Sequence, residues 1–145
     1  MSQPATTVLL NRLLAMVGRS FPQYLQYARP YIPPGRESLF EAIEAIVADQ
    51  NVMVERISRQ LSDAQVPPRF GEFPMEYTDL HDLDIDFLVG AAANYQEQDI
   101  ASIAAIAEQL GLAPAAQSLA EEALGMAKGH LDSLRELLPE ATTPT

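Results

Sequence analysis

The sequence predicts an all-α protein: an antiparallel four-helix bundle with a long crossover between its second and third helices. In four segments apolar residues recur at spacings of three and four, which places them on one face of a helix. No segment shows the sustained alternation of a half-buried strand. The outer connections are short and the central one is long. Because 48% of the 145 residues are hydrophobic, residues 1–145 suit one domain with one core.

The first predicted helix covers about residues 6–29. Its apolar stripe keeps its phase across Pro22, which predicts one helix bent at Pro22 rather than two, since proline removes a backbone hydrogen bond and kinks a helix. The prolines and glycine of "PYIPPG" end it. The stripe consists of Leu10, Leu13, Leu14, Val17, Phe21, Tyr24, Leu25 and Ala28.

The second predicted helix covers about residues 38–64, and its apolar seam contains one polar residue, Gln50. The crossover follows at about 65–78, in a stretch rich in prolines and aromatic residues. A helix of about 26 residues is about 39 Å long, and an extended chain of about 15 residues covers about 45–50 Å. The connection can therefore cross the whole bundle, and the alternative is an ordinary up-down bundle with a long central loop.

The third predicted helix covers about residues 79–110, and the fourth covers about 115–138 and ends before Pro139. Acidic residues crowd the start of the third helix. Carboxylates are favoured there by the free backbone amides and the helix dipole, so we interpret them as capping residues, with a cation site as the alternative. We also expect His81 in this capping turn. The acidic residues are Asp79, Asp82, Asp84 and Asp86.

The charge and the residue types exclude several classes of function. The formal net charge of −11 disfavours nucleic acid and anionic membrane as partners, because phosphate binding needs a basic stripe. The absence of cysteine excludes thiol catalysis and thiolate metal sites, and it fits a reducing compartment. The start "MSQPATTVLLNR" does not read as a signal peptide. We expect a cytoplasmic protein without a membrane span.

His130 is the residue that first suggests a site. The spacing of Ala123, Ala127, His130, Leu134 and Leu137 predicts that His130 points into the bundle. A di-metal site in such a bundle needs about four carboxylates and two histidines, often as Glu-x-x-His. Here Ala127 stands three positions before His130, and the inward positions offer one histidine with one or two acids. We therefore expect no di-iron site within one chain.

Two stretches resemble the bacterioferritins. "LNRLLAMVGRSFPQYLQYAR" is similar to their first helix, and "MAKGHLDSLREL" is similar to their last long helix. The resemblance implies a ferritin-like, bacterioferritin- or rubrerythrin-like bundle whose di-iron site is degenerate. Laid on this sequence, the family's metal-site residues fall on Val17, Tyr24, Ile46, Asp49, Glu97, Ala127 and His130.

Two hypotheses of function follow. The first is a non-catalytic ferritin-like bundle that acts through self-association or partner binding, as a homodimer through its first two helices or as an adaptor. The second is a metal- or small-ligand-binding protein with a residual site around a central cavity. The first needs no cofactor and no catalytic residue, whereas the second admits iron or another divalent metal. The candidate residues of the residual site are His130, Asp99, Glu97, Asp49, Gln50 and Tyr24.

Overall fold

A computed structural model describes residues 3–80 and 83–142. The described chain is helical and contains no strand, which confirms the all-α prediction. Within it, no helix is long and apolar enough to cross a membrane. The elements are α1 (Gln3–Gly18), α2 (Phe21–Ala28), α3 (Glu37–Asp63), the short 3-10 helix η1 (Met75–Asp79), α4 (Ile85–Gln109) and α5 (Pro114–Thr142).

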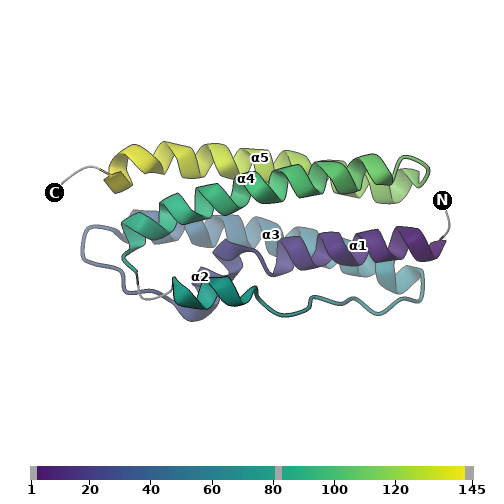
Figure 1. Cartoon of the computed structure of the whole chain (residues 1–145), viewed down its shortest axis with the longest axis horizontal. Helices are drawn as coiled ribbons and strands as arrows, with labels where there is room; N and C mark the ends of the chain where they lie inside the picture. Colours follow the sequence, from purple (N-terminus) through teal and green to yellow (C-terminus); the bar gives the residue numbers. More distant parts are fainter. Residues whose placement is uncertain (1–2, 81–82, 143–145) are drawn as a thin grey trace.

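The four long helices form two packed pairs, α1 with α3 and α4 with α5 (Figure 1). After α3, residues 64–80 run along α1 and past α2, from one end of the molecule toward the other (Figure 1). As a result α3 and α4 point in the same direction, while the two members of each pair point in opposite directions.

The expectation of one bent helix over residues 6–29 is wrong, because α1 and α2 are separate helices. Ser20 is the N-cap of α2, and its hydroxyl accepts the Gln23 N–H at 3.4 Å. Pro22 lies in the first turn of α2, where its missing N–H removes no helical hydrogen bond. The proline therefore belongs to a helix start rather than to a bend.

The start of α4 is also capped by a side chain, whereas α3 begins without a side-chain cap. The bounds of α3 agree with the predicted 38–64 to within one residue. The prediction that the next helix starts near 79 is wrong, because Asp84 caps α4 by accepting the Phe87 N–H at 2.9 Å. Residues 75–79 instead form η1. His81 and Asp82, which we expected in this turn, lie outside the described residues.

The end of α5 also differs from the prediction. We expected the helix to stop before Pro139, but the helical backbone continues to Thr142. Proline removes one backbone hydrogen bond, while its ring fixes φ at a value that a helix accepts. The α5 helix therefore continues past Pro139.

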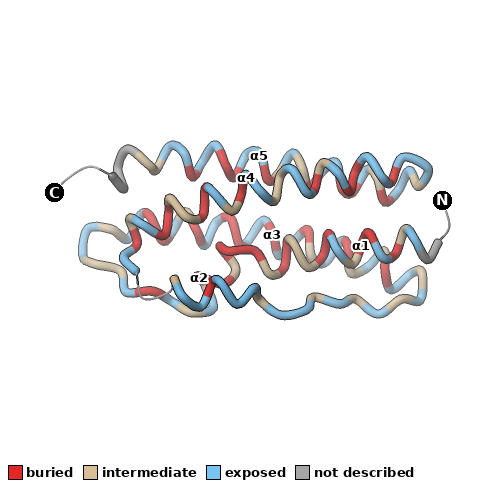
Figure 2. The backbone as a smooth tube through the Cα atoms, in the orientation of Figure 1, coloured by how far each residue is buried: buried red, intermediate tan, exposed pale blue. Residues whose placement is uncertain are grey.

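The core lies between the helix pairs, and Figure 2 shows buried residues on the sides of the helices that face one another. One cluster contains the apolar faces of α1, the second half of α3 and the first half of α5. A second cluster joins α2, the first half of α3 and the first half of α4 to Tyr77 of η1. The predicted seam of α3 is buried, except that Val54 is half-buried at its edge.

Candidate functional site

The candidate pair at the centre of the bundle is His130 of α5 with Asp49 of α3. His130 is 7% exposed, so its inward orientation agrees with the spacing. Its Nε2 atom lies 2.8 Å from Oδ2 of Asp49, whose side chain is 63% exposed. The Nδ1 atom of His130 is buried and has no hydrogen-bond partner among the described residues. The pair therefore connects the interior to the surface between α3 and α5.

Two other predicted site residues are engaged elsewhere. Gln50 is buried, and its Oε1 atom accepts a hydrogen bond from the Ser20 hydroxyl at 2.9 Å. This bond holds the junction of α1 and α2 against α3. Glu97 lies at the surface, where it pairs with Arg135 of α5. The hydrogen-bond partners of Gln50 and Glu97 are therefore Ser20 and Arg135 rather than His130.

Asp99 and Tyr24 border a cluster of aromatic rings. The Tyr77 ring lies 5.0 Å from the rings of both Phe21 and Tyr95, and Tyr24 packs on the same group. Burial raises the pKa of Asp99 to about 7. The pKa of Tyr77 is also raised, by burial first and by the charge of Asp99 second.

The positions on which the family's metal residues fall do not fit a di-iron centre. Val17, Ile46 and Ala127 are buried and offer no side-chain donor. Among residues 3–80 and 83–142, no three histidine, aspartate or glutamate side chains are grouped to hold a metal ion. His130 and Asp49 alone cannot compensate two buried divalent ions. Val17 and Ala127 pack in one core cluster.

Gln96 is an interior polar residue that the sequence did not single out. It is 3% exposed, and its Nε2 atom donates to the backbone oxygen of Ala127 at 3.1 Å. The neighbouring Tyr95 is half-buried. A side-chain amide carries both a hydrogen-bond acceptor and donors, so it can form hydrogen bonds inside a bundle without introducing a charge. The buried amide side chains Gln50 and Gln96 are both occupied by internal hydrogen bonds.

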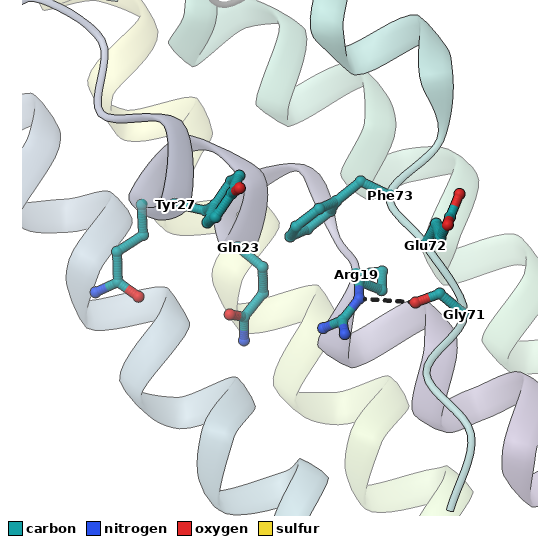
Figure 3. Close-up of a pocket in the computed structure, with 7 residues that line it drawn as sticks. Arg19, Gln23, Tyr27, Gly71, Glu72 and Phe73 are labelled. Atoms are coloured by element: carbon teal, nitrogen blue, oxygen red, sulfur yellow. Dashed lines mark hydrogen bonds between the residues drawn. The ribbon is translucent and has the colours of Figure 1, made fainter.

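A second candidate site lies on the outer surface, along the segment between α3 and α4. Two hydrogen bonds from Asn11 hold this segment to α1: Oδ1 accepts the Arg69 N–H at 2.8 Å, and Nδ2 donates to the Pro67 oxygen at 3.5 Å. Farther along, Nε of Arg19 donates to the Gly71 oxygen at 3.0 Å (Figure 3). Side chains of α1 and of the junction between α1 and α2 therefore fix the path of the segment.

Two open clefts flank the contact between Arg19 and Gly71. The α2 cleft, of about 600 Å³, lies between α2 and the segment and is lined by Arg19, Gln23, Gln26, Tyr27, Glu72 and Phe73 (Figure 3). The α1 cleft, of about 510 Å³, is lined mainly by apolar groups, with Val8, Arg12, Arg69 and Phe70 among them. Gly71 borders both clefts, so they adjoin.

Sequence reasoning missed this surface because it is formed by a segment without helical periodicity. The sequence does contain one signal of this surface, which is the position of its few basic residues. The chain has 9 lysines and arginines against 20 acids, and Arg12, Arg19 and Arg69 all line these two clefts.

Comparisons of the chain with protein-family models, with curated proteins and with solved structures give no match.

Proposed function

We propose that this protein is a non-catalytic ferritin-like bundle that acts by associating with a second copy or with another protein. Support for the ferritin-like assignment comes from the lengthwise connection between α3 and α4 and from the resemblance of "LNRLLAMVGRSFPQYLQYAR" and "MAKGHLDSLREL" to bacterioferritin helices. Val17 and Ala127 support the loss of ferroxidase chemistry. The cysteine-free composition is consistent with a cytoplasmic setting.

The observation that carries the associative function is the exposure of large apolar side chains beside the two clefts. Val8 of α1 is 54% exposed and lines the α1 cleft, and Tyr27 of α2 is 77% exposed and lines the α2 cleft. The Tyr27 ring stacks on Phe73, with centroids 5.8 Å apart. Apolar and aromatic groups on a hollowed surface are typical of protein interfaces, where they supply most of the binding energy.

The test is a comparison of surface variants by light scattering and by cross-linking to candidate partners. Val8→Ser with Tyr27→Ser is expected to abolish association while the helical circular dichroism spectrum stays unchanged. Leu112→Ser is the matched control, because Leu112 is 79% exposed at the turn between α4 and α5 and lines neither cleft. A wild type that stays monomeric at high concentration and cross-links to no partner would contradict the proposal.

One observation favours a second candidate, the binding of a divalent ion at His130. Imidazole and carboxylate are common metal ligands, and those of His130 and Asp49 lie 2.8 Å apart. Thermal melting with and without Mn²⁺ or Zn²⁺ tests it. This candidate expects the ion to raise the melting temperature of the wild type but not that of Asp49→Asn. Equal shifts in the two proteins, or none in either, would remove it.

A further inference from the structure

The arginines of the two clefts differ from most other basic residues of the chain in having no carboxylate partner. Arg36, Arg56, Arg59 and Arg135 each form an ion pair with an aspartate or glutamate. No described carboxylate lies within ion-pair distance of Arg12, Arg19 or Arg69. In a chain with 20 acidic residues, this surface carries three arginines and one carboxylate, that of Glu72, so its local charge is positive.

The guanidinium of Arg19 is held in place before any partner arrives. Its Nε donates to Gly71 O at 3.0 Å and its Nη1 to Gly18 O at 3.2 Å. Its Cζ atom lies 4.9 Å from the centroid of the Phe70 ring and 5.2 Å from that of Phe73. A fixed guanidinium loses little conformational entropy when it binds a carboxylate, and its planar fork matches that group.

We propose that the groove formed by the α1 and α2 clefts binds an acidic, extended segment of a partner protein, with the segment's carboxylates on Arg12, Arg19 and Arg69 and its apolar side chains beside Val8 and Tyr27. This inference rests on the proposed associative function and names the chemistry of the partner. The groove follows residues 66–73 of the connecting segment and is open to solvent rather than a closed pocket.

Charge favours an acidic protein segment in this groove over a second copy of the chain or a nucleic acid. Pairing the same groove of two copies face to face would bring two sets of three arginines together, and like charges across an interface are unfavourable. A nucleic acid is also unfavourable, because its continuous phosphate backbone would meet the field of a chain with a net charge of −11. A short acidic segment needs only the local charge of the groove.

The test measures fluorescence anisotropy of labelled peptides matched in length to residues 66–73. One peptide alternates Glu and Leu, a second replaces Glu with Gln, and a third replaces Glu with Lys. At about 50 mM salt, the wild type is expected to bind the Glu peptide at least tenfold more tightly than the Gln peptide, and to lose this preference as salt screens the charges. Equal binding of the Glu and Lys peptides, or no binding of the Glu peptide, would overturn the inference.

Charge reversal locates the site. Arg12→Glu with Arg69→Glu changes two exposed side chains and is expected to weaken binding of the Glu peptide at least tenfold and to strengthen binding of the Lys peptide. The control is Arg29→Glu with Lys128→Glu, an equal change of charge at exposed positions that line neither cleft. Equal losses in both double variants would show an effect of net charge alone and would reject the groove.

The inference and the proposed function fail in different ways. If the wild type associates through Val8 and Tyr27 but ignores the Glu peptide, the acidic partner is wrong and the associative function stands. If the wild type stays monomeric, cross-links to no partner and ignores the Glu peptide, both fail.

Discussion

Nε2 of His130 and Oδ2 of Asp49 lie 2.8 Å apart and join α5 to α3 at the point where the bundle interior meets solvent. His130 is almost fully buried, whereas Asp49 is largely exposed. The exposed carboxylate therefore gives one ring nitrogen of a buried imidazole a partner and orients the ring. The relationship explains how this bundle accommodates a polar side chain in its interior.

A double-mutant cycle measures the strength of this contact. Asp49→Ala is expected to destabilise the protein by about 1 kcal/mol, because it leaves Nε2 of His130 without its partner. His130→Ala should cost more, since it also removes a buried ring. The coupling energy from urea unfolding of both single variants and the double variant should be about 1 kcal/mol. Additive losses would mean that the two side chains do not interact in solution.

The pH dependence of stability tests the environment of Asp99. Its pKa in the folded protein is about 7, above the ordinary value of 3.8, so the folded state holds the proton more tightly than the unfolded chain. Below about pH 4 the carboxyl of Asp99 is protonated in both states and does not change the free energy of unfolding. As the pH rises from about 4 toward 7, the unfolded chain releases this proton while the folded protein keeps it, so the folded state loses stability. Asp99→Asn removes this loss.

The expected gain from Asp99→Asn is about 2–4 kcal/mol at pH 8 and close to zero at pH 4, measured by urea unfolding at each pH. Asp132→Asn, at an exposed position of α5, is the control and is expected to follow the wild type. A gain of equal size at both pH values would show that the amide stabilises for another reason than the proton of Asp99.

The faces of the helices could be predicted from the sequence, but the neighbours of the candidate residues could not. The inward position of His130 follows from spacing along its own helix, because a helix repeats every 3.6 residues. Asp49 and Asp99 lie on two other helices, and which of them meets His130 depends on the rotation and offset of those helices. Spacing within one helix carries no such information. Of these two aspartates, it is Asp49 that lies within hydrogen-bond distance of His130.

The break between α1 and α2 was missed for a different reason. The apolar stripe continues from Leu14 through Phe21 in helical phase, so periodicity alone predicts one helix. The deciding interactions are local hydrogen bonds of Ser20, which caps α2 and also bonds to Gln50 of α3. Ser20 stands two residues before Pro22 and matches the pattern of an N-cap, a local signal that the periodicity of apolar residues does not contain.

The buried small residue Ala127 tests the loss of the metal site. Ala127→Glu is expected to destabilise by about 1–3 kcal/mol, because a carboxylate placed there would be desolvated without a partner. Ala105→Glu makes the same change at an exposed position of α4 and should cost little. An unchanged melting temperature for Ala127→Glu would mean that this face of α5 does not point inward.

Alanine substitutions at three glycines compare the close packing at Gly18 with the open surface of α5. A Cβ atom added at Gly18 would lie 2.7 Å from Cδ1 of Phe70, so the ring must move and Gly18→Ala should destabilise by about 1–2 kcal/mol. At Gly125 and Gly129 an added Cβ meets nothing within 4 Å, and alanine should stabilise the helix by about 0.5–1 kcal/mol. Thermal melts of the three variants check the opposite signs, and a stabilising Gly18→Ala would refute the close contact with Phe70.

Asn11 holds the connecting segment to α1, and its loss should free that segment locally. Asn11→Ala removes the acceptor of the Arg69 N–H and the donor to Pro67 O, both on an exposed surface, so global stability should fall by only about 1 kcal/mol. Local opening should rise more clearly, because few other contacts hold an irregular segment. Trypsin cleavage after the exposed Arg69 is therefore expected to become several-fold faster, and Asn94→Ala, at an exposed position of α4, should leave it unchanged. Equal cleavage rates in all three proteins would mean that the segment keeps its place without Asn11.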